Sequence, residues 1–147
     1  MLNNLNYRLY GRTKGRKKKN KDNFLLKIQL KKLDKKNYNI LDIGAGFGES
    51  TIKLAKGDKN KIVIGCEKYI DGLNSIYKKA QLASLKNVLI YQGNIHQMLD
   101  EYCTEASISE VWILFPDPWP KKRHFKRRLI NEFFFKKIYK YLKYGAT

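Results

Sequence analysis

The stretch NILDIGAGFGE at residues 39–49 decides the fold that we predict for this chain. A short apolar run from Asn39 to Gly44 is typical of a buried strand, and a helix is expected from Glu49 to about Lys56. The glycines between them allow positive φ angles and let the backbone approach a ligand closely. A strand, a glycine loop and a helix N-terminus in this order predict a nucleotide-type cradle.

Two acidic residues flank this cradle. Asp42 lies just before the loop, and its carboxylate suits a ligand that carries a positive charge and hydroxyls, whereas it would repel a pyrophosphate. Glu67 ends the second predicted strand, Lys61–Cys66, where it can accept both ribose hydroxyls, although taken alone it is equally typical of an exposed loop. Together with Gly44 and Gly46, this pattern favours S-adenosylmethionine as cofactor. The third glycine of the dinucleotide fingerprint is missing, which argues against a nicotinamide cofactor.

Further short strands and amphipathic helices alternate along the chain. The third strand, Asn87–Gln92, leads into Asn94, whose side chain could hydrogen-bond an adenine or could simply belong to a turn. We expect His96 to start a helix rather than to bind a ligand. The order predicts an α/β fold with an open, mainly parallel sheet. The remaining predicted elements are a helix from Asp22 to about Leu33, a helix with Ile70, Leu73, Tyr77, Ala80 and Ser84 inward, a short helix Met98–Tyr102, a strand Glu110–Phe115, and a helix Lys126–Tyr144 with Ile130, Phe134, Ile138 and Tyr141 inward, stopped by Gly145.

The net charge is the most unusual feature of the composition. With 31 Lys and Arg against 13 Asp and Glu among 147 residues, the chain carries +18, which favours a polyanionic partner, although a lysine-rich bias is the alternative. We interpret Met1–Lys21 as a basic arm that contacts RNA or as a solubilising tail. No apolar run is long enough to span a membrane, and Cys66 and Cys103 are too few for a disulfide framework or a metal site, so we expect a cytoplasmic protein without metal.

The second informative stretch is FPDPWPKKRHFKRRL at residues 115–129. Pro116 and Pro118 restrict the backbone on both sides of Asp117, so this carboxylate emerges from a stiff loop at the end of a strand, where a reacting group should lie. Trp119 follows and could pack on a base or on the core. The basic residues after it that we expect to hold phosphates are Lys121, Lys122, Arg123, Lys126, Arg127 and Arg128, and His124 among them is a further candidate for RNA binding.

This stretch resembles the signature of the bacterial tRNA (guanine-N7-)-methyltransferases. The segments LDIGAGFGES and GCEK look like the donor-binding motifs of that family, and YGRTKGR near the start is similar to its basic N-terminal segment. The resemblance implies a Rossmann-like class I fold and S-adenosylmethionine at Asp42, Glu67, Asn94 and Asp117. It also implies an active-site role for Asp117, a substrate contact at Lys121 and tRNA binding by residues 123–128.

The chain departs from the family pattern in two ways. Asn94 stands where many members have aspartate, and the sequence ends at Thr147 without the family's Thr-Asp pair and Thr-x-Tyr-Glu motif. We therefore expect residues 22–147 to form an incomplete methyltransferase domain that lacks the C-terminal strands. Its fourth strand should expose an apolar edge, which invites self-association, so we expect a monomer or a weak homodimer. The alternatives are a catalytically weak RNA-binding module with the same fold and, less favoured, a nicotinamide-dependent oxidoreductase.

Overall fold

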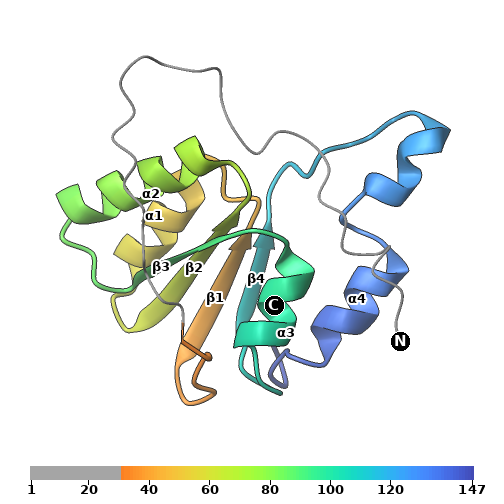
Figure 1. The fold of residues 1–147 in the computed structure, drawn as a ribbon. Helices are drawn as coiled ribbons and strands as arrows, with labels where there is room; N and C mark the ends of the chain where they lie inside the picture. The colour runs from red at the N-terminus through yellow and green to blue at the C-terminus, as the bar shows by residue number, and fades with distance from the viewer. Residues whose placement is uncertain (1–30) are drawn as a thin grey trace.

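A computed structural model describes residues 31–147, which form one parallel sheet with helices on both faces (Figure 1). The predicted basic arm and most of the helix from Asp22 lie outside the described residues. The elements are β1 (Tyr38–Ile43), α1 (Glu49–Gly57), β2 (Lys61–Glu67), α2 (Ile70–Leu82), β3 (Val88–Gln92), α3 (Ile95–Tyr102), β4 (Glu110–Ile113), the 3-10 helix η2 (Lys122–Arg127) and α4 (Glu132–Tyr139). The four predicted strands and the open parallel α/β architecture are confirmed.

The sheet separates two apolar layers. Helices α1 and α2 cover one face, and α3 and α4 cover the other (Figure 1). Successive side chains of a strand point to opposite faces, so Ile40 packs with α1 and α2, whereas Leu41 packs with α3 and α4. Phe134 and Ile138 of α4 complete the second layer, and both are buried.

The strand order is β3-β2-β1-β4. The chain therefore builds outward from β1 through β2 to β3, then crosses to the other side of β1 to form β4. This places a topological switch point between β1 and β4. In open α/β sheets, ligands bind outside the carboxyl ends of the strands at such a point, and the glycine loop after β1 lies at this position.

Three helix predictions were wrong in detail. In α2, Ile76 rather than Tyr77 is fully buried, and Ser84 lies beyond the helix with φ of 51°. The helix expected from Lys126 begins only at Glu132, because Asn131 caps it by accepting a hydrogen bond from the backbone N–H of Phe134. Ile130 is consequently not inward but 43% exposed. The residues Lys31–Leu33 are also not helical, although Leu33 is buried.

The outer edge of β4 is partly covered, contrary to the expected bare edge. The end of the chain runs alongside it: the N–H of Lys143 donates to Ile108 O at 2.8 Å, and the N–H of Val111 donates to Thr147 O at 2.7 Å. Helix α4 ends at Tyr139, so Gly145 does not stop it but lies in this returning segment with φ of 74°. Within residues 31–147, no helix is both long and apolar enough to cross a membrane.

Candidate active site

The glycine loop is shaped by three residues with positive φ angles: Gly44 at 75°, Gly46 at 55° and Gly48 at 85°. The N–H of Gly44 donates to Cys66 O at 2.8 Å, which ties the loop to the end of β2. A Cβ on Gly44 would meet no atom within 4 Å, whereas a Cβ on Gly48 would lie 2.3 Å from Ile76 Cγ1 of α2. The loop is therefore packed against α2 on one side and open on the other.

Asp42 lies at the base of the loop and is only 1% exposed. Its Oδ2 accepts hydrogen bonds from Ser50 Oγ and Thr51 Oγ1, both at 2.6 Å. These bonds fasten the first turn of α1 to β1. The structure thus gives the carboxylate a role in holding the cradle, and a direct contact of Asp42 with a ligand stays a prediction.

Glu67 connects the glycine loop with the start of α2. Its Oε2 accepts the N–H of Gly46 at 3.0 Å, and its Oε1 accepts the N–H groups of Lys68 and Tyr69 at 2.7 and 3.0 Å. A carboxylate oxygen can accept two hydrogen bonds. Oε2 can therefore accept a second hydrogen bond, for example from a ligand hydroxyl, in addition to the one from Gly46.

Asn94 forms the N-cap of α3 and is 5% exposed; its Oδ1 accepts the backbone N–H of His96 at 2.9 Å. This is the turn role that the sequence left open, and an adenine contact stays a prediction. His96 lies in the first turn of α3, as expected, and packs against Phe133 and Phe134. Burial, together with the charge of Lys137, lowers the pKa of His96 to about 4.

Asp117 extends from the loop after β4 and is 67% exposed at its side chain. Phe115 and Trp119, two residues before and after it, have φ angles of 50° and 38°, so the backbone is in the left-handed region on both sides of the carboxylate. Asp117 Oδ2 lies 3.9 Å from Nζ of Lys68, which directly follows Glu67. Since β4 and β2 flank β1, this ion pair links the loop after β4 with the segment after β2.

The basic segment divides into two groups. Lys121, Arg123 and Lys126 are exposed. The other group folds back on the Asp117 loop: Arg127 lies over the Trp119 ring at 4.9 Å, His124 meets that ring edge-on at 5.5 Å, and Arg128 donates to the loop backbone. Burial and the charges of Arg127, Arg123 and Lys121 lower the pKa of His124.

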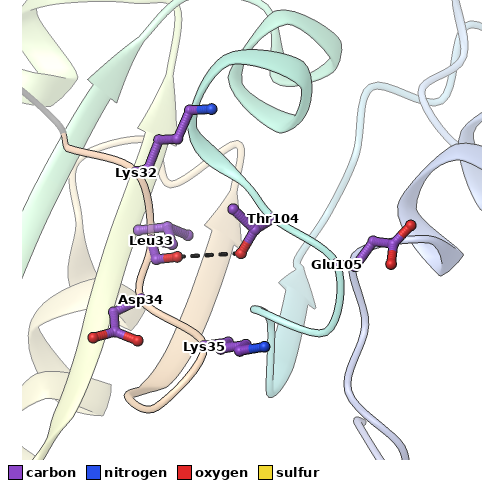
Figure 2. A pocket seen from close by; sticks show the side chains of 6 residues that line it. All are labelled: Lys32, Leu33, Asp34, Lys35, Thr104 and Glu105. Carbon is purple, nitrogen blue, oxygen red and sulfur yellow. Dashed lines mark hydrogen bonds between the residues drawn. The ribbon is translucent and has the colours of Figure 1, made fainter.

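A separate hollow of about 580 Å³ lies far from this constellation in the fold (Figure 2). It is formed by residues before β1 and residues between α3 and β4, and Thr104 Oγ1 donates to Leu33 O within it at 3.5 Å. These segments lie at the amino ends of the strands, opposite the glycine loop. The lining residues are Lys32, Leu33, Asp34, Lys35, Thr104 and Glu105. In the part of the chain that the structure describes, no cluster of three or more His, Cys, Asp or Glu could hold a metal ion.

The comparison with known proteins places this geometry in a family. A family model described as "Putative methyltransferase" matches residues 36–147. The chain belongs to this methyltransferase family. It is 37% identical over 134 residues to the tRNA (guanine-N(7)-)-methyltransferase of Neorickettsia sennetsu, which covers 87% of this chain and 60% of the relative. It is 42% identical over 103 residues to the enzyme of that name from Buchnera aphidicola, which covers 70% of this chain and 43% of the relative.

The methyltransferase chain thus spans about half the length of the curated relatives it matches. Among solved structures it is similar to M. jannaschii TYW2 in complex with AdoMet, with a TM-score of 0.51 and 25% identity, covering 73% of this chain and 42% of that one. This likeness agrees with the predicted Rossmann-like class I fold.

Three structural residues of the candidate site were missed by sequence reasoning. Ser50 and Thr51 hold Asp42, and Gly72 in the first turn of α2 lets the helix approach the loop, since a Cβ there would lie 2.2 Å from Gly46 O. Gly72 carried a signal, because a glycine inside a helical pattern often has a packing reason. The two hydroxyl residues carried none.

Proposed function

We propose that this chain carries the methyl-transfer site of a tRNA (guanine-N7-)-methyltransferase, which uses S-adenosylmethionine to methylate N7 of a guanosine in the variable loop. The observation that carries the proposal is the position of Asp117. Its loop follows β4 and the glycine loop follows β1, on the two sides of the switch point, and Asp117 is paired with Lys68, which directly follows Glu67. The names of the relatives support the same reaction.

The residues at the cradle fit this donor. The open side of Gly44 leaves space next to the loop, and Glu67 Oε2 can accept a ribose hydroxyl. When bound, S-adenosylmethionine supplies a methyl group on a positively charged sulfur, and acidic side chains suit that charge. The residues proposed to hold it, directly or through the loop they support, are Asp42, Gly44, Gly46, Glu67, Asn94 and Asp117.

The methyl transfer to N7 requires mainly that the guanine is held in the correct position. N7 of guanine has a free lone pair and carries no proton, so its attack on a methyl group needs no base to start it. Asp117 is exposed at its side chain and can accept hydrogen bonds from the amino and imino edge of the guanine. Its negative charge would then favour the positive purine that forms as the methyl group arrives.

The exposed basic residues next to this loop suit a nucleic acid. Lys121, Arg123 and Lys126 lie within ten residues of Asp117, and the chain as a whole carries +18. Contacts of this kind orient an RNA without reading its sequence. We infer that the partner is tRNA and that the protein acts in the cytoplasm as a monomer or weak homodimer.

Methyl transfer from labelled S-adenosylmethionine to unmodified tRNA, followed by nucleoside analysis, tests the proposal. We expect the label in 7-methylguanosine, and we expect Asp117→Asn to lower kcat by about 100-fold or more. Glu105→Gln is a matched control, because Glu105 is an exposed carboxylate at the opposite end of the sheet. Transfer that is absent while tRNA still binds would contradict the enzyme and favour the RNA-binding module.

A further inference from the structure

Arg128 makes contacts that a phosphate-binding residue would not need. Its Nε donates to Pro118 O at 3.1 Å, and its Nη2 donates to Trp119 O at 3.3 Å. The guanidinium also stacks over the ring of Phe125, 3.8 Å from the ring centre. These contacts join the end of the basic segment to the two residues that directly follow Asp117.

We propose that Arg128 is a positioning residue, which clamps the backbone of the Asp117 loop and so fixes the carboxylate over the glycine loop. This inference rests on the proposed function. Trp119 has φ of 38°, and a bulky residue in that region is strained and persists only where its surroundings hold it. Two hydrogen bonds from a charged donor to successive carbonyls supply that hold.

The clamp is itself anchored in the core. The backbone O of Arg128 accepts Asn131 Nδ2 at 2.9 Å, and Asn131 Oδ1 caps α4 by accepting the N–H of Phe134. Phe134 belongs to α4, is 1% exposed and packs in the core against the sheet. A continuous series of contacts thus leads from the core through the cap of α4 and Arg128 to the residues beside Asp117.

The neighbouring side chains support the same conformation. Arg127 lies over the Trp119 ring while His124 meets its edge, so both the backbone and the ring of Trp119 are held. Lys122 offers the contrast, since it is exposed at the start of η2. Charge at Lys122 can serve a phosphate, whereas the planar fork of Arg128 is directed at carbonyls, a geometry that lysine cannot reproduce.

The experiment uses Trp119 as its own reporter. The sequence has two tryptophans, so a Trp112→Phe background leaves Trp119 alone. In that background we compare Arg128→Ala, Arg128→Lys and Lys122→Ala by time-resolved fluorescence anisotropy, by methyl-transfer kinetics and by the salt dependence of tRNA binding. The parent Trp112→Phe protein is the reference for every value.

We expect both Arg128 variants to increase the local mobility of Trp119 and to lower kcat by about 10- to 100-fold, because a displaced reacting group costs about that much. Their salt dependence of tRNA binding should match the parent. Lys122→Ala should leave the mobility unchanged and reduce the slope of log affinity against log salt by about 0.7 to 0.9.

Two results would overturn the clamp. One is an Arg128→Lys variant with parental mobility and kcat, since charge alone would then suffice. The other is an unchanged Trp119 mobility in Arg128→Ala. Because the anisotropy does not depend on transfer, it tests the clamp even if the parent methylates no tRNA. If the parent methylates tRNA but Trp119 is as immobile in the Arg128 variants as in the parent, the proposed function is supported and the clamp is refuted.

Discussion

Gly72→Ala should destabilise the protein although it removes a glycine from a helix. Alanine is favoured over glycine in a helix interior by about 1 kcal/mol. In this structure, however, the added Cβ would lie 2.2 Å from Gly46 O and 3.4 Å from Glu67 Cγ. The glycine loop must then move away by about 1 Å to reach an ordinary contact distance. Overpacking of this kind costs about 1–3 kcal/mol, so we expect a net loss of about 1 kcal/mol in the free energy of unfolding.

The loop movement also has a consequence for binding. Gly46 N donates to Glu67 Oε2 at 3.0 Å, so a shift of the loop disturbs the carboxylate that is proposed to hold the ribose. We expect the affinity for S-adenosylmethionine, measured by calorimetry, to fall by about tenfold, the equivalent of 1.4 kcal/mol.

Gly57→Ala is the matched control, because Gly57 ends α1 and a Cβ there meets nothing within 4 Å. Urea unfolding should show Gly57→Ala to be neutral or more stable by up to about 1 kcal/mol. The reasoning is refuted if Gly72→Ala is as stable as Gly57→Ala and binds S-adenosylmethionine as tightly as the parent chain.

Substitutions at Thr51 and His96 test the buried polar groups. Thr51→Val removes a hydroxyl that donates to buried Asp42 and should cost about 1–3 kcal/mol in urea unfolding, whereas Thr51→Ser should keep most of the stability. His96 has its pKa lowered to about 4 from an ordinary 6.5, by burial and Lys137 against the opposing effect of Asp100. The unfolded chain therefore binds the proton first, so the stability is complete above about pH 6.5 and falls by up to about 3 kcal/mol towards pH 4. His96→Gln should flatten that part of the pH profile, and an unchanged profile would contradict the assignment.

The strands were predictable because each is a short apolar run, and the runs end at a glycine, a polar residue or, for the fourth strand, Pro116. The predicted Asn39–Gly44 differs from β1 by one residue at each end, and the predictions for β2 and β3 differ by one residue at one end. The predicted Glu110–Phe115 extends two residues beyond the end of β4 at Ile113. The start of α4 was not predictable from periodicity. The spacing of Ile130, Phe134 and Ile138 continues upstream of the true helix, and only the hydrogen bond of Asn131 with Phe134 shows where it begins.

For the candidate site as well, some features were predictable from the sequence and others were not. Sequence reasoning placed Glu67 and Asp117 at strand ends, because ligands of parallel sheets lie there. It could not predict that Glu67 bonds Gly46, or that Arg128 turns back to Pro118, since these contacts join segments whose approach depends on the whole fold. The sequence therefore indicates which residues lie near the candidate site, while the structure shows which hydrogen bonds fix their positions, such as those of Glu67 with Gly46 and of Arg128 with Pro118.

The arrangement also explains how one basic chain could recognise a cation and a polyanion. The charge of +18 acts over the Debye length of about 8–10 Å and would attract the proposed tRNA before contact. Glu67 is embedded in hydrogen bonds at the loop, so its charge acts at contact distance on a group within the cradle. Asp117 is exposed and is paired with Lys68, which directly follows Glu67. In the proposed function, a donor with a positive sulfur and an acceptor carried on phosphates would therefore meet at this carboxylate.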